Sequence, residues 1–80
     1  MNGQFEIDNT AYPVGYLKSQ GDHRVFDMRS LRPYHDEAIT KEEAIRVSSA
    51  VNAKLRNGDI KDINADSEDI RATVQEALGQ

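Results

Sequence analysis

The stretch Thr40–Gly58, TKEEAIRVSSAVNAKLRNG, carries a helix start, a helical period and a helix stop that agree with one another. The Thr40 hydroxyl can accept a hydrogen bond from the amide of Glu43, while the Glu43 carboxylate reaches back to the Thr40 amide, as in a capping box. Gly58 supplies the positive φ that a helix C-cap requires. The sequence therefore predicts a helix over residues 41–57.

One face of this helix is apolar and the other is polar. Its apolar side chains fall within about 80° of arc when they are placed at 100° per residue. They are Ala44, Val47, Val51 and Leu55. On the opposite face Glu42 lies one turn before Arg46, the order that favours an ion pair worth about 0.3 kcal/mol. The apolar face is expected in the core and the polar face in solvent.

The residues before this helix alternate as β-strands do. Gln4–Asp8 predicts a short half-buried strand, and Ala11–Lys18 and His23–Arg29 predict the arms of a hairpin, joined by a connection that contains a glycine. Pro13 cannot donate to a strand ladder, so the first arm is expected to be an edge or to begin after the proline. The predicted strands together occupy residues 4–29.

Two further segments complete the predicted chain. Residues 30–39 have no steady period and contain a proline, which indicates a connector. A second helix is predicted over residues 67–78, with Asp66 or Ser67 as its cap and Gly79 after it. Strands followed by helices indicate an α+β fold. We expect a small antiparallel sheet, either a hairpin or a three-stranded meander, with both helices packed on one face.

Composition limits what the chain can be. Its 80 residues predict one domain, and the absence of cysteine excludes disulfides and thiolate zinc sites. Hydrophobic residues make up 38% of the chain and tryptophan is absent, so the core is expected to be thin. The net charge of −4 is concentrated in residues 59–80. The sequence has no signal peptide and no membrane-length apolar run, so we expect a cytoplasmic protein without a membrane partner.

The motifs that carry chemistry are incomplete. Asp62–Asp66 begins like a calcium-binding loop, but Ser67 takes the place of the required glycine and Thr73 that of the bidentate glutamate, which favours a simple Asx turn. The two histidines, His23 and His35, have no nucleophile in a recognisable setting. No glycine-rich phosphate loop occurs. We therefore expect no enzyme activity, no cofactor and no metal site.

The leading hypothesis is a small non-catalytic protein–protein interaction module that acts as an adaptor, a regulatory subunit or an inhibitor of a larger protein. It depends on elimination, on an exposed hairpin edge, and on aromatic and arginine side chains of the kind enriched at interface hot spots. The predicted partner-binding residues are Tyr16, Arg24, Arg29, Arg32 and Tyr34. A homodimer formed through the hairpin edge would satisfy the same features.

Two alternatives use charge. The basic, aromatic hairpin could contact phosphates and stack on bases, as in a nucleic-acid-binding regulator that acts alone or as a homodimer. The acidic total charge opposes this alternative, because nucleic-acid-binding domains are usually basic. The second alternative is an acidic mimic, in which residues 59–80 imitate a phosphate track and block a nucleic-acid-binding protein.

Overall fold

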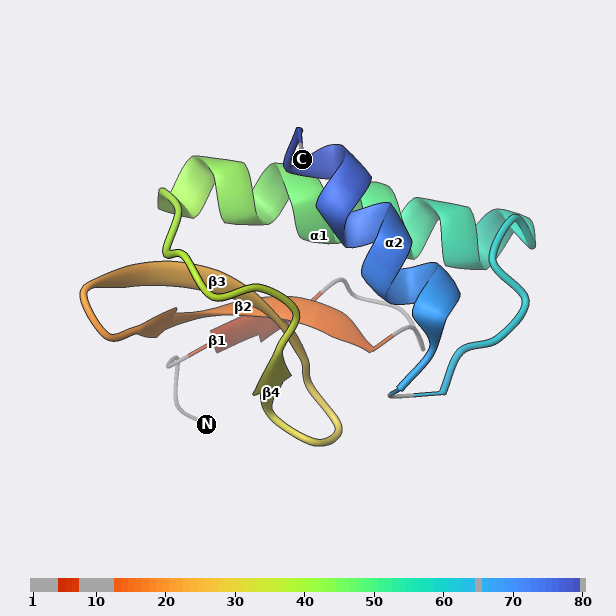
Figure 1. The fold of residues 1–80 in the computed structure, drawn as a ribbon, viewed down its shortest axis with the longest axis horizontal. Helices are drawn as coiled ribbons and strands as arrows, with labels where there is room; N and C mark the ends of the chain where they lie inside the picture. Colours follow the sequence, from red (N-terminus) through yellow and green to blue (C-terminus); the bar gives the residue numbers. More distant parts are fainter. Residues whose placement is uncertain (1–4, 8–12, 65, 80) are drawn as a thin grey trace.

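The computed structural model describes residues 5–7, 13–64 and 66–79, and it confirms the α+β fold. An antiparallel sheet has the strand order β1-β2-β3-β4, and both helices lie on one face of it (Figure 1). The strands are β1 (Phe5–Ile7), β2 (Val14–Ser19), β3 (Asp22–Asp27) and β4 (Arg32–Pro33), and the helices are α1 (Lys41–Asn57) and α2 (Glu68–Ala77). None of the helices in the described ranges has the length and apolarity needed to cross a bilayer.

The sheet is a meander with one strand more than the sequence predicts. The extra strand, β4, is only two residues long and lies inside the predicted connector 30–39. β2 begins directly after Pro13, as expected. The hairpin turn contains only Gln20 and Gly21, whose φ values of 51° and 104° are both positive. A two-residue turn of this kind matches the twist of the strands that it joins. The ends of the predicted strands at residues 4, 8, 11 and 12 lie outside the described part of the chain.

The hairpin edge is covered, which corrects the expectation of an exposed edge. β2 lies between β1 and β3, so the first arm is not an edge strand. On the outer side of β3, the Val25 carbonyl accepts from the Tyr34 amide at 2.8 Å, and the Val25 amide donates to His35 Nε2 at 3.0 Å. His23 exchanges two backbone hydrogen bonds with Ile39, at 2.9 and 2.8 Å. A second copy of the chain therefore finds no free ladder on this hairpin.

α1 begins and ends at the expected residues. The Thr40 hydroxyl accepts from the Glu43 amide at 3.1 Å, and Gly58 closes the helix with a φ of 82°. The Glu43 carboxylate pairs with Arg46 rather than with the Thr40 amide, so only one half of the predicted capping box is present. This pair also replaces the predicted ion pair between Glu42 and Arg46, because the arginine turns toward the residue three positions before it.

The core lies between the sheet and the two helices. It consists of Val14, Tyr16, Val25, Tyr34, Ala44, Val47, Val51, Leu55, Ile60, Ile70 and Val74. The predicted apolar face of α1 is therefore buried as expected. Asn52 is also fully buried, and its side chain bonds the backbone of Val14: Oδ1 accepts from the amide at 3.3 Å and Nδ2 donates to the carbonyl at 2.7 Å. One side-chain amide thus satisfies both backbone groups of a buried strand residue.

α2 crosses α1 and is fixed at both of its ends (Figure 1). The Ser67 hydroxyl accepts from the Ile70 amide at 3.2 Å, which confirms a cap at one of the two predicted positions. At the other end, Arg46 of α1 donates to the Ala77 carbonyl at 2.9 Å. A guanidinium at this position satisfies a terminal carbonyl and complements the negative end of the helix dipole.

Candidate binding site

A buried carboxylate anchors the loop between β3 and β4. Asp27 is 1% exposed, and its Oδ1 accepts from Arg29 Nε at 2.9 Å. Its Oδ2 accepts from the amide and the hydroxyl of Ser30, at 3.1 and 2.7 Å. Burial alone would raise the pKa of Asp27, but the hydrogen bonds from Ser30 and Arg29 outweigh it and hold the pKa below its usual value of 3.8. Asp27 is therefore an ionised anchor at neutral pH.

The anchored loop holds Leu31 away from the protein. Leu31 has a φ of 58° and is 56% exposed, and its amide donates to the Asp27 carbonyl at 2.7 Å. The left-handed conformation costs a residue with a Cβ atom about 1–2 kcal/mol. Such strained residues concentrate at functional sites, where the surrounding structure maintains them. Leu31 combines this strain with an apolar side chain directed into solvent.

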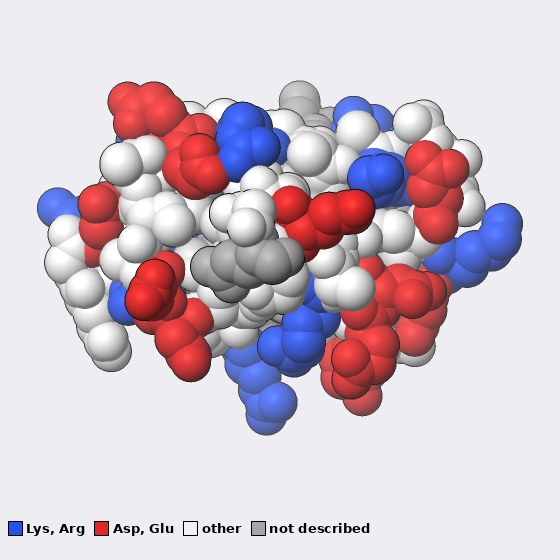
Figure 2. Space-filling view, turned by 45° about the horizontal axis from the view of Figure 1, so that its top comes forward, with Lys and Arg blue, Asp and Glu red and all other residues white. Residues whose placement is uncertain are grey.

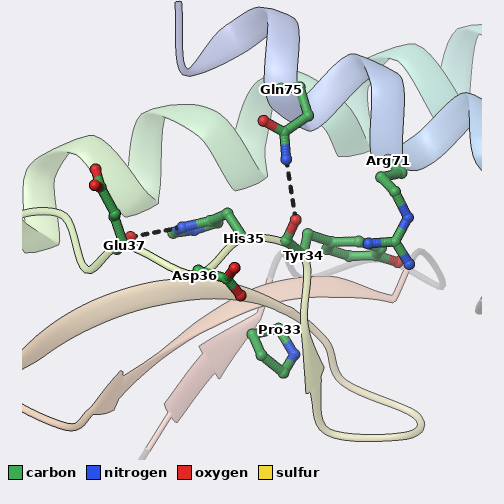
Figure 3. A pocket seen from close by; sticks show the side chains of 7 residues that line it. All are labelled: Pro33, Tyr34, His35, Asp36, Glu37, Arg71 and Gln75. Atoms are coloured by element: carbon green, nitrogen blue, oxygen red, sulfur yellow. Dashed lines mark hydrogen bonds between the residues drawn. The ribbon is translucent and has the colours of Figure 1, made fainter. Parts of the chain in front are cut away.

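Tyr34 lies under α2, directly after β4. The Cζ atom of Arg71 is 5.9 Å from the centre of the Tyr34 ring, and Gln75 Nε2 donates to the Tyr34 carbonyl at 3.2 Å (Figure 3). The Tyr34 hydroxyl is buried and makes no hydrogen bond to a described residue. Burial and the charge of Asp27 raise the pKa of Tyr34 to about 12, against the opposing effects of Arg29 and Arg71. The hydroxyl therefore stays protonated and available as a donor.

Two open hollows adjoin this tyrosine, and Pro33, Tyr34 and Arg71 line both of them. The first, which we call the His35 hollow, has a volume of about 600 Å³ (Figure 3). Its other lining residues are His35, Asp36, Glu37 and Gln75. The second, the Arg32 hollow, has a volume of about 490 Å³. Its other lining residues are Asp27, Ser30, Arg32, Asn64 and Asp66.

His35 holds the connector against the sheet. Its Nδ1 donates to the Glu37 carbonyl at 2.7 Å, and its Nε2 accepts from the Val25 amide at 3.0 Å. Burial is the main cause of its pKa, which lies below the usual 6.5. Since both ring nitrogens are occupied by backbone groups, neither is free to act as a base or as a metal ligand in this arrangement.

The predicted Asx turn is present in the segment before α2. The Asn64 amide donates to the Asp62 side chain at 3.1 Å, and the Ser67 amide donates to the Asn64 carbonyl at 3.0 Å. Within the described part of the chain, no three His, Cys, Asp or Glu side chains converge in a way that could hold a metal ion.

The structure brings three of the five predicted binding residues together. Arg29 and Arg32 belong to the β3–β4 loop and β4, and Tyr34 follows directly. Arg32 is exposed, whereas Arg29 is paired with Asp27. Tyr34 is 3% exposed, so its ring belongs to the core and contacts the hollows from beneath.

The other two predicted residues lie elsewhere. Tyr16 is 8% exposed, and its ring centre is 6.2 Å from that of His23. Arg24 is half-buried, and its guanidinium group donates to the backbone carbonyls of Ser19 and Asp36. The five residues therefore do not form one exposed surface.

Sequence reasoning did not identify Leu31, Asp27 or Arg71 as site residues. A short polar residue three positions before a serine is a pattern that can fix a turn, so Asp27 and Ser30 carried a usable signal. Arg71 has no such signal, because the sequence places it on the polar face of α2, where a solvent-exposed side chain is expected. The positive φ of Leu31 leaves no trace in its residue type.

Charges around the site are mixed. Figure 2 shows acidic and basic side chains interspersed over most of one face of the molecule, with a group of acidic side chains at its lower right. The ion pairs of the described residues join Asp22 to His23, Asp27 to Arg29 and Glu43 to Arg46. Arg32 and Arg71 form none with a described residue, although both line the Arg32 hollow.

The chain matches no protein-family model, and it has no significant similarity to a curated protein or to a solved structure.

Proposed function

We propose that the chain is a small non-catalytic protein-binding module that contacts its partner through the β3–β4 loop and the adjoining Arg32 hollow. The observation that carries this proposal is Leu31. A buried carboxylate with three hydrogen bonds from the loop holds an apolar side chain outward in a strained backbone conformation. Glycine or asparagine at position 31 would adopt this conformation with less strain. A contact between the leucine side chain and a partner would offset the strain.

The surroundings of Leu31 have the composition of a binding surface. The large apolar side chains that are exposed within the described ranges are Leu31, Ile45 and Ile63. Leu31 lies between two lining residues of the Arg32 hollow in the sequence, and Ile63 directly precedes a third, Asn64. Apolar side chains beside arginines and an aromatic ring are typical of interface hot spots.

The non-catalytic part of the proposal is supported by how the polar groups are used. Both His35 nitrogens bond to the backbone, and the Ser30 hydroxyl donates to Asp27. A nucleophilic serine needs a base that accepts its proton, and the depressed pKa of Asp27 makes that carboxylate a weak base.

The nucleic-acid alternative receives less support from the same geometry. Arg24 is bonded to backbone carbonyls and Arg29 to Asp27, so two of the basic side chains on which this alternative depends are engaged within the chain. A gel-shift assay at low salt tests it directly, since phosphate contacts are strongest there.

The proposal is tested with Leu31→Asn, because asparagine tolerates the left-handed conformation but removes the apolar side chain. Ile45→Gln is the matched control, since it removes an exposed apolar side chain from α1. The wild-type chain and both variants are immobilised and used to capture proteins from the native host, with quantitative mass spectrometry as the readout. We expect a protein that the wild type and Ile45→Gln retain and that Leu31→Asn loses. With that protein purified, Leu31→Asn should weaken the Kd about tenfold.

Identical capture by Leu31→Asn and the wild type would contradict the proposal. Circular dichroism and urea unfolding of Leu31→Asn verify that its fold is retained. A loss of capture is then due to the changed binding surface and not to unfolding.

A further inference from the structure

We infer that the Arg32 hollow is a site for a single carboxylate group presented by a protein partner. This inference rests on the proposed function and adds the chemistry of what the partner inserts. It is carried by three features of the hollow: two arginines without ion pairs, a buried hydroxyl without a partner, and a local charge that suits one negative group.

The arginines are the first feature. Arg32 comes from β4 and Arg71 from α2, and both line the hollow without an ion pair to a described residue. Arg29, in the neighbouring loop, is by contrast committed to Asp27. The Arg71 guanidinium lies beside the Tyr34 ring, which limits its freedom before a ligand arrives (Figure 3). Guanidinium groups bind carboxylates through paired hydrogen bonds, and prior positioning reduces the entropy lost on binding.

The Tyr34 hydroxyl is the second feature. It is buried, makes no hydrogen bond to a described residue, and belongs to a side chain that is 3% exposed. Tyr34 lines the Arg32 hollow together with Asp27 and Arg71. Buried polar groups in proteins nearly always have a partner. A carboxylate oxygen that enters between Arg32 and Arg71 would accept from this donor.

The balance of charge is the third feature, and it distinguishes a carboxylate from a phosphate. Asp27 and Asp66 line the hollow together with Arg32 and Arg71, and Arg29 neutralises Asp27 from the side. The site therefore has one net positive charge, which matches one carboxylate. A phosphate dianion would bring one negative charge more than the site balances, and it would lie beside the Asp66 carboxylate.

The carboxylate can come from an acidic side chain or from the C-terminus of the partner, and peptides separate these two sources. The full chain is titrated with three short apolar peptides while amide and arginine Nε–H signals are followed by NMR. The first peptide is capped at both ends and contains one central Glu. The second has Gln at the centre and a free C-terminal carboxylate. The third has Gln and both caps, and inorganic phosphate serves as a fourth probe.

We expect the first or the second peptide to cause saturable shifts of the Arg71 and Arg32 Nε–H signals in the millimolar range, as suits a single charged contact. The uncharged peptide should cause none. Equal shifts with the uncharged peptide, or tighter binding of inorganic phosphate than of either carboxylate, would overturn the inference.

Substitutions then assign the contacts. Arg71→Gln and Arg32→Gln should each weaken the binding of the carboxylate peptide about tenfold, whereas Lys54→Gln, at an exposed cation of α1, should leave it unchanged. Tyr34→Phe should weaken binding about fivefold while the free energy of unfolding stays the same or rises, because an unpaired buried hydroxyl is removed. A purely structural hydroxyl would give the opposite result, with lower stability and unchanged peptide binding.

The inference can fail while the proposed function holds. In that case Leu31→Asn loses the captured partner, and Arg71→Gln binds it with the affinity of the wild type. If Leu31→Asn keeps the partner, the proposed function fails first.

Discussion

α1 and residues 27–39 are both ordered, but for different reasons. α1 follows rules that are local in sequence: a cap at Thr40, a stop at Gly58 and one apolar face between them. In residues 27–39 the Asp27–Ser30 bonds are local as well, but other bonds join separate segments: His35 bonds to Val25 of β3, and Gln75 of α2 bonds to the Tyr34 carbonyl. The bounds of α1 therefore follow from signals that are local in sequence, whereas the candidate site also depends on contacts between segments that are distant in sequence.

The largest expected effect is at Asn52, where α1 departs from its local rules. Asn52→Ala leaves the amide and the carbonyl of Val14 unpaired inside the protein, and it should lower the free energy of unfolding by about 3 kcal/mol. Asn57→Ala is the control, because Asn57 is exposed in the same helix and should change stability by only about 0.5 kcal/mol. Urea unfolding followed by circular dichroism measures both. Equal stability of the two variants would show that the amide is dispensable.

The next effect concerns the anchor of the loop. Asp27→Ala removes three hydrogen bonds, and since Arg29 can return to solvent, we expect a loss of about 2 kcal/mol. Hydrogen exchange at the Leu31 amide should become faster as the loop is released. Asp36→Ala, at an exposed acid in the same region, is the control and should behave like the wild type.

A smaller effect depends on pH. Burial keeps the pKa of His35 below 6.5 in the folded protein, so the unfolded chain takes up the proton first as the pH falls. The contribution of neutral His35 to the free energy of unfolding is therefore fully present above pH 6.5 and is lost as the pH falls toward the lowered pKa. We expect the whole loss to be about 1 kcal/mol, the value of one hydrogen bond. The charge of Arg24 lowers the pKa of His35 further, while the hydrogen bond to the Glu37 carbonyl and the charge of Asp36 oppose the shift.

The free energy of unfolding, measured at pH 7.5 and pH 5.5, tests this prediction. For His35→Gln it should be the same at both pH values. The stabilisation by Asp27 has a separate window, since its lowered pKa means that this contribution is lost only below pH 3.8. A slope that persists in His35→Gln between pH 7.5 and 5.5 would assign the effect to another group.

The smallest effect compares the two residues other than glycine that have a positive φ in the described ranges, Gln20 and Leu31. Gln20→Gly and Leu31→Gly should each raise stability by about 0.5 kcal/mol, because relief of strain slightly exceeds the added freedom of the unfolded chain. Thermal unfolding should show a rise of about 2–4 °C for each. Only Leu31→Gly should also weaken the binding of the partner. A loss of partner binding in Gln20→Gly would move the binding surface to the hairpin turn.

These differences explain what the sequence could and could not predict. The bounds of α1 were predicted correctly because caps and period act within a few residues, and the cap of α2 at Ser67 was found in the same way. β4 was missed because two residues carry no period, and their pairing depends on β3. Tyr34 was predicted on the surface because residue type alone does not separate an interface aromatic from a core one.

The site residues show the same division. Arg32 could be proposed from composition, whereas Arg71 enters the site only because α2 crosses α1 and places the arginine over Tyr34. Leu31 could not be found, since its significance lies in a backbone angle that Asp27 imposes from the end of the preceding strand.

The bond between Asn52 and Val14 has a consequence for how the chain assembles. A slip of β2 by one residue would turn Val14 out of the core and offer the Asn52 amide the backbone of a residue whose polar groups point the other way. The Asn52 amide can make both of its hydrogen bonds to Val14 in only one register of the hairpin, so α1 favours that register. Docking of α1 should therefore favour the native register, and the Val14 amide should be strongly protected from exchange with solvent.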